Sequence, residues 1–133
     1  MRDDTAMAVL IVAGVVLLLV HIAMQVVSVT RERGSQWNAG PRDEGSAPKG
    51  VFAGRADRAL RNFQETFPAF CVLALLLIVL QRADGAGFAG ALLWLAARIV
   101  YLPLYVSGVP YLRTLVWLAA AFGLLLMAFR VIV

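Results

Sequence analysis

The chain has 133 residues, 62% of them hydrophobic, and a formal net charge of +4. Soluble domains contain roughly 45–50% apolar residues, and a soluble chain of this length has too little interior to bury the excess. The composition therefore excludes an ordinary soluble domain and predicts that lipid surrounds most of the surface. The charges cluster between Arg31 and Glu65, as expected of a cytoplasmic loop, so the basic balance does not indicate nucleic-acid binding.

Four apolar segments are long enough to cross a bilayer as helices. A helix needs about 20 apolar residues to cross a hydrocarbon core of about 30 Å. The sequence predicts spans at about residues 6–29, 55–81, 86–107 and 111–132. We therefore expect an all-α fold, an integral membrane four-helix bundle that forms a single domain.

A hydrophilic connection of about residues 30–54 joins the first two spans. Its Gly and Pro content is typical of turns and not of a helix. Four spans put both termini on one side of the membrane. The basic residues of the connection and of the next span predict that this connection is cytoplasmic, which places the termini on the opposite side.

Polar residues share one face at the start of the second span. Arg58, Arg61, Asn62 and Glu65 occupy positions i, i+3, i+4 and i+7, which form one stripe on a helix. A charge beside hydrocarbon is unfavourable unless it is paired or faces a wet cavity. The stripe therefore predicts a ligand site at the membrane edge.

The third span carries a second polar stripe, made of Arg98, Tyr101 and Tyr105. Arg98 lies well inside an apolar segment, where an unpaired guanidinium is unfavourable. We therefore expect Arg98 to have a carboxylate partner. Glu65 is the candidate, because it is the carboxylate embedded in an apolar flank.

Arg113 and Thr114 lie at the start of the fourth span. A cation is unfavourable at a helix N-terminus, which favours anion binding by Arg113, although snorkelling toward headgroups is an alternative. The topology brings this end to the same side as the start of the second span and the end of the third. Cations and phenols with few carboxylates suit a small anionic ligand.

The convergent residues allow one kind of chemistry, the activation of a bound nucleophile. With one His and one Cys, the chain offers neither metal-ligand spacing nor a catalytic triad. A guanidinium lowers the pKa of a neighbouring thiol, and a tyrosine hydroxyl can donate to the thiolate. An anion site, thiol activation and a purely structural stripe that holds the helices together are all open at this level.

The segment from Arg58 to Pro68, with its Arg, Asn and Glu spacing, resembles the second helix of the MAPEG family, the membrane-associated proteins of eicosanoid and glutathione metabolism. The chain also resembles the later helices of this family, at Arg98 with Tyr101, at Tyr105, and at Arg113 with Thr114. The resemblance implies a homotrimer that binds glutathione between neighbouring subunits near the cytoplasmic side. The short chain and minimal loops suggest a bacterial inner membrane, with both termini periplasmic.

The resemblance also implies roles for single residues. It assigns glutathione binding to Arg58, Arg61, Asn62 and Glu65, the lining of the same site to Tyr101 and Tyr105, and thiol activation to Arg113 beside Thr114. We add Arg98 and Thr114 to the glutathione-binding residues. Tyr105 joins Arg113 as a catalytic candidate, because its hydroxyl can donate to a thiolate.

The expected function is that of a glutathione-dependent membrane enzyme, a transferase or peroxidase for hydrophobic electrophiles at the bilayer edge. Its expected partners are further copies of itself, membrane lipid and a hydrophobic substrate. The alternative is a non-catalytic protein that binds lipid or glutathione. The step from Tyr105 to Arg113 favours this alternative, because it is one residue longer than in the pattern it resembles, and one residue turns a helix position by about 100°.

Overall fold

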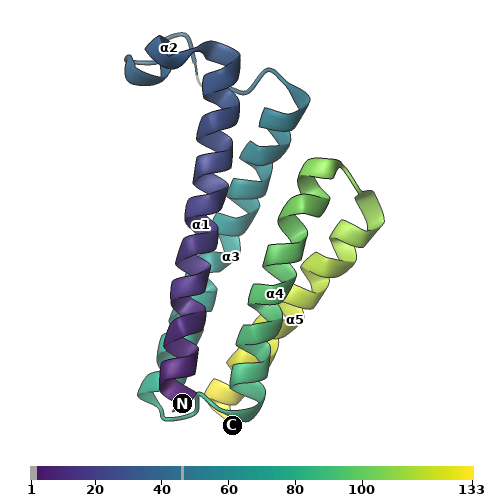
Figure 1. Ribbon diagram of the computed structural model, residues 1–133. Coiled ribbons are helices and arrows are strands. Elements are labelled where there is room, and N and C mark those ends of the chain that lie inside the picture. The colour runs from purple at the N-terminus through teal and green to yellow at the C-terminus, as the bar shows by residue number, and fades with distance from the viewer. Residues whose placement is uncertain (1–2, 46) are drawn as a thin grey trace.

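The computed structural model describes residues 3–45 and 47–133, which are helical apart from short connections. Its long helices are α1 (Asp3–Arg33), α3 (Val51–Val79), α4 (Gly85–Ser107) and α5 (Pro110–Ile132). They run alternately up and down, so both termini lie at one end (Figure 1). Each of the four is long and apolar enough to cross a membrane. The chain therefore has the architecture of an integral membrane protein.

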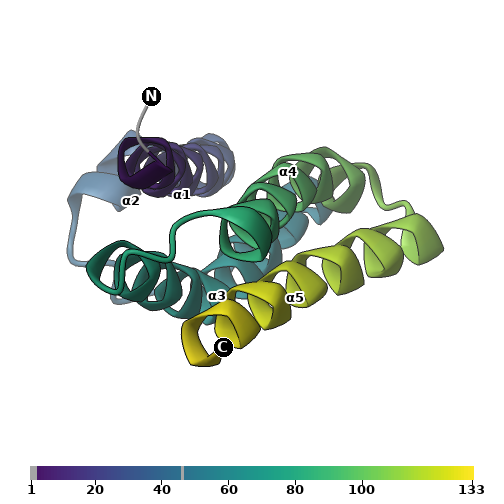
Figure 2. The same cartoon turned by 90° about the horizontal axis from the view of Figure 1, so that it is seen from below.

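The long helices form two pairs. One pair is α1 and α3, which pack along each other, and the other is the hairpin of α4 and α5. Contacts between α3 and α4 join the two pairs (Figure 2). Within the described residues, α5 packs on α4 and α3 without packing on α1. Exposed apolar side chains such as Val12 and Leu19 of α1, and Phe122 and Leu125 of α5, cover the outer faces. These faces contact lipid.

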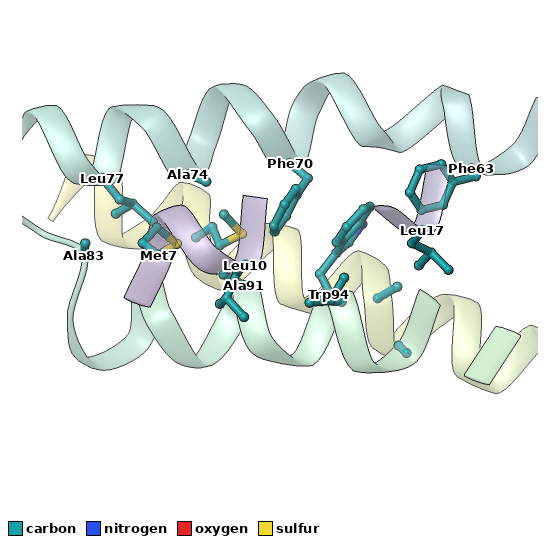
Figure 3. Close-up of a cluster of buried hydrophobic side chains, with 14 residues drawn as sticks. Met7, Leu10, Leu17, Phe63, Phe70, Ala74, Leu77, Ala83, Ala91 and Trp94 are labelled. Carbon is teal, nitrogen blue, oxygen red and sulfur yellow. The ribbon is translucent and has the colours of Figure 1, made fainter. Parts of the chain in front are cut away.

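Aromatic side chains of α3 and α4 form the centre of the core. Phe70 stacks on Trp94 with 4.0 Å between ring centroids and 12° between ring planes, and Phe63 lies 5.7 Å from Trp94. Met7 and Leu10 of α1 belong to the same buried cluster (Figure 3). Rings this large leave little freedom in a close-packed core, so they fix the spacing of α3 and α4.

Two glycines let α4 and α5 approach closely. A Cβ atom on Gly123 would lie 2.6 Å from the carbonyl oxygen of Gly90 and 2.9 Å from the backbone nitrogen of Trp94. A Cβ atom on Gly90 would lie 2.5 Å from the carbonyl oxygen of Gly123. Backbones this close have no room for a larger residue at either position.

α1 and α3 extend beyond their predicted spans where they meet the connection, whereas α3 ends at Val79, before its predicted end at about residue 81. α1 continues to Arg33 and α3 begins at Val51, because hydrocarbon sets the apolar length whereas backbone hydrogen bonding continues into the polar flank. The connection also contains a short helix, α2 (Ser35–Ala39), flanked by Gly34 and Gly40. The prediction that this connection holds only turns is therefore wrong. Gly34 and Gly40 mark the two ends of α2, and the glycines of the connection do not prevent a short helix between them.

Candidate functional site

A polar cavity lies between α3, α4 and α5, in the half of the bundle away from the termini, where α4 ends and α5 begins. Figure 1 shows this end of the bundle at the top. Its volume is about 290 Å³. It is lined by Asn62 of α3, by Tyr101 and Tyr105 of α4, and by Arg113, Thr114 and Trp117 of α5. The structure thus brings together predicted site residues from three helices within one chain.

Arg98 is joined to this cavity through Asn62. Its Nη1 donates a hydrogen bond of 2.8 Å to Oδ1 of Asn62, and its guanidinium carbon lies 4.6 Å from the ring centre of Tyr101 and 5.3 Å from that of Phe63. Among the described residues no carboxylate pairs with it, and Glu65 is exposed. The predicted carboxylate partner is therefore wrong. Asn62 faces α4, so an amide oxygen and two ring faces surround the cation instead.

Part of the Arg98 guanidinium has no partner. The side chain is 1% exposed, and its Nε and Nη2 atoms are buried without a hydrogen-bond acceptor in the chain. Buried donors left unpaired are unfavourable, and a buried charge more so. Arg98 is not itself a lining residue of the polar cavity, so its unpaired donors lie behind Asn62 and Tyr101, which do line it.

Arg113 and the two tyrosines form the opposite part of the lining. The Arg113 guanidinium carbon lies 4.7 Å from the ring centre of Tyr105, and the rings of Tyr101 and Tyr105 are 5.5 Å apart and tilted by 51°. Arg113 makes no hydrogen bond or ion pair within the part of the chain that the structure describes. Its donors are thus available to a ligand.

Trp117 lines the polar cavity but was not among the predicted site residues. It follows Arg113 by four positions, so both side chains share one face of α5. That spacing was the available signal. Its ring adds an apolar wall beside the cations and phenols.

The remaining stripe residues of α3 do not line the polar cavity of their own chain. Arg58, Arg61 and Glu65 are exposed. Arg61 pairs with Asp57 at 2.8 Å, with 71% of the arginine side chain exposed, and such surface pairs contribute little to stability. One chain therefore presents a lined cavity and, separately, a row of exposed charges on α3.

Two side chains, those of Arg55 and Glu32, tie helix ends together in this half of the bundle. Arg55 donates from Nη1 to the carbonyl oxygen of Val106 at 3.1 Å, which ties the start of α3 to the end of α4. Glu32 accepts the backbone N–H groups of Lys49 at 2.9 Å and Gly50 at 2.6 Å, which ties α1 to the start of α3. The sequence reasoning missed both residues, because their partners are backbone groups that only the tertiary fold brings near.

An apolar groove lies on α1, in the same half of the bundle as the polar cavity. Its volume is about 420 Å³, and it is lined mainly by aliphatic side chains of α1 together with Phe52, with Arg31 among the lining residues.

Within the described residues, no three His, Cys, Asp or Glu side chains gather closely enough to hold a metal ion.

Comparison with known proteins agrees with this architecture. A family model described as the MAPEG family matches residues 10–133, which include every residue of the polar cavity. A search of curated proteins gives no match.

Proposed function

This chain belongs to the MAPEG family, and from that premise we propose that it is a glutathione-dependent membrane enzyme. The family includes glutathione-dependent transferases and peroxidases. The observation that carries the proposal is the polar cavity, where the unpaired donors of Arg113 lie beside two phenols. Asn62, another lining residue, accepts a hydrogen bond from the buried guanidinium of Arg98.

The polar cavity offers groups that suit glutathione, a peptide with two carboxylates, an ammonium group and a thiol. Guanidinium groups bind carboxylates through paired hydrogen bonds, and Arg98 has two buried nitrogens without an acceptor. The Asn62 amide can also bond a peptide group. These donors support a bound tripeptide better than a purely structural stripe, in which the Arg98 donors would be expected to find protein partners.

The thiol chemistry falls to Arg113 and Tyr105. A guanidinium beside the thiol favours the thiolate, and the Tyr105 hydroxyl can donate to the sulfur. The thiolate then attacks the electrophilic carbon, a carbon–sulfur bond forms, and the leaving group departs with its bonding electrons. The short distance between the Arg113 guanidinium and the Tyr105 ring supports placing both groups at the sulfur.

The hydrophobic substrate would come from the lipid phase. The outer faces of the helices are apolar, and the apolar groove on α1 runs toward the end of the bundle that holds the polar cavity. A compound dissolved in the bilayer can therefore approach this end without crossing water. This supports membrane-soluble electrophiles as the substrate class.

A homotrimer would bring the separate parts of the site together. Arg58 and Glu65 are exposed at the membrane edge, where unpaired charges are unfavourable, and they form no ion pair within the described residues. Arg61 is exposed beside them and has only its surface pair with Asp57. A neighbouring subunit that meets this face would add these groups to its own polar cavity, and Glu65 would then take the ammonium group. We place the connection on the cytoplasmic side of a bacterial inner membrane, because its basic residues fit that side, and the termini in the periplasm.

The alternative is a non-catalytic protein that binds glutathione or lipid. One observation favours it: Arg58, Arg61 and Glu65 lie outside the polar cavity of the single chain. Calorimetry that detects glutathione binding, combined with no turnover of any electrophile, would support this alternative.

The deciding experiment is an activity assay on the detergent-purified protein with glutathione and a chlorinated nitrobenzene. We expect Arg113→Ala to lower the turnover rate by about 10²–10³-fold, as for the loss of one preorganised charge-stabilising donor. Arg130→Gln is the matched control, because Arg130 pairs with Asp84 at the opposite end of the bundle. Equal rates for Arg113→Ala and the unchanged protein would contradict the proposed catalysis.

A further inference from the structure

A second cavity with charged walls lies in the connection between α1 and α3. Its volume is about 420 Å³, within the roughly 300–1,000 Å³ that is typical of small-molecule sites. Its charged and aromatic lining comes from Arg33, Trp37, Arg42, Asp43 and Glu44. We call it the connection cavity. It shares no residue with the polar cavity of α3, α4 and α5.

Two guanidinium groups of the connection cavity lie over one aromatic ring. The guanidinium carbon of Arg33 is 5.0 Å from the centre of the Trp37 ring, and that of Arg42 is 5.1 Å from the same centre. Cations gain from a ring face, but two like charges held at one ring repel each other. An anion that contacts both guanidinium groups would reduce this repulsion.

The charged groups around the connection cavity are not neutralised by one another. Within the described residues, neither arginine forms an ion pair with Asp43 or Glu44. Arg33 instead donates to the carbonyl oxygen of Ala47, and Arg42 donates to Asn38. The Nε atom of Arg33 and the Nε1 atom of Trp37 are buried without an acceptor. The cavity therefore offers cationic donors and separate carboxylates, which is the pattern that complements a zwitterion.

The position of this cavity indicates where the zwitterion comes from. α1 crosses the membrane and ends at Arg33, and α2 with Trp37 follows at once. Tryptophan and arginine at such a point lie at the level of the lipid headgroups. We infer that the connection cavity binds the headgroup of an aminophospholipid, with its phosphate on Arg33, Arg42 and the Trp37 N–H and its ammonium on Asp43 and Glu44.

Lipid retention measured by native mass spectrometry tests this site without reference to catalysis. The detergent-purified protein is titrated with phosphatidylethanolamine, phosphatidylcholine and phosphatidic acid, which share a phosphate and differ in the cation. We expect phosphatidylethanolamine to bind most tightly. Arg42→Gln should weaken it by about tenfold, the effect of losing one charged hydrogen-bonding partner. Arg130→Gln, at the opposite membrane edge, is the matched control and should bind normally.

The carboxylates give a separate test of the ammonium. In the double variant Asp43→Asn, Glu44→Gln, phosphatidylethanolamine should bind no better than phosphatidic acid. Equal binding of all three lipids by the unchanged protein, or an Arg42→Gln variant that binds like it, would overturn the assignment.

Soluble competitors separate a lipid from a free zwitterion. Competition by free phosphoethanolamine shows that the headgroup alone is recognised, whereas lack of competition shows that the acyl chains are also needed. Both results support a phosphate-and-ammonium site. Displacement of the lipid by free glutathione but not by phosphoethanolamine would overturn it, because the cavity would then serve a soluble peptide.

Discussion

Asn62 accepts a hydrogen bond of 2.8 Å from Arg98, and this contact links α3 to α4 beside the polar cavity. The guanidinium is otherwise surrounded by the rings of Tyr101 and Phe63. Removing one partner of a buried polar pair is more destabilising than replacing both partners with apolar residues, because the remaining partner stays buried without a hydrogen bond. Asn62 thus supports the fold and, under the proposed function, also orients an arginine toward glutathione.

The first prediction concerns this hydrogen bond. Asn62→Ala should lower the free energy of unfolding by about 1–3 kcal/mol, because the Arg98 guanidinium loses its acceptor while it stays buried. Asn62→Asp should keep most of the stability, since the carboxylate can accept from the same Nη1 atom. Thermal unfolding in detergent measures both effects. Identical melting temperatures for Asn62→Ala and the unchanged protein would show that the contact does not stabilise the fold.

The second prediction concerns the crossing of α4 and α5. Gly123→Ala should destabilise the protein by about 1–3 kcal/mol, the usual range for overpacking, because the new methyl group meets the backbone of Gly90 and Trp94. Gly54→Ala is the matched control. Its Cβ atom would meet only the flexible end of Arg58, at 3.3 Å, and alanine favours the helix by roughly 1 kcal/mol. A Gly123→Ala variant as stable as Gly54→Ala would contradict this packing.

The lengths of the hydrophobic segments were enough to predict the four long helices and to predict which helix ends lie on the same side. Alternating spans necessarily place Asn62, Tyr105 and Arg113 near one end, and the structure places all three in one cavity. The finer prediction about Arg98 failed for a geometric reason. Asn62 and Glu65 lie on the same broad stripe, but three positions at about 100° each leave them about 60° apart around the helix axis. Only packing against α4 decides which of the two side chains turns inward.

Contacts to backbone groups lay beyond the reach of sequence patterns. Arg55 and Glu32 each bind backbone atoms of another helix end, and no residue spacing identifies a carbonyl or amide partner. The short helix α2 was missed for a related reason. The residues Ser35–Ala39 carry no strong helical signal, and the helix forms where the connection packs beside the end of α1.

The third prediction concerns Arg55 as a positioning residue. Arg55→Ala should weaken glutathione binding by about three- to tenfold, because the end of α4 loses a hydrogen bond of about 1 kcal/mol that ties it to α3. Arg55→Lys should restore part of the affinity, since an ammonium group can also reach a carbonyl oxygen. Calorimetry with glutathione measures the affinities. Unchanged affinity in Arg55→Ala would show that this contact does not position the site.

The fourth prediction concerns Tyr105 and Arg113 as one catalytic unit. Tyr105→Phe keeps the ring that lies 4.7 Å from the Arg113 guanidinium and removes only the hydroxyl. It should lower kcat by about 10²-fold, in the range for a positioned donor, with little change in glutathione affinity. If both groups stabilise the same thiolate, the double variant with Arg113→Ala should be little slower than the slower single variant, since residues that act together are non-additive. Rate losses that multiply would show instead that the two side chains act independently, with Arg113 binding glutathione at a distance from the sulfur.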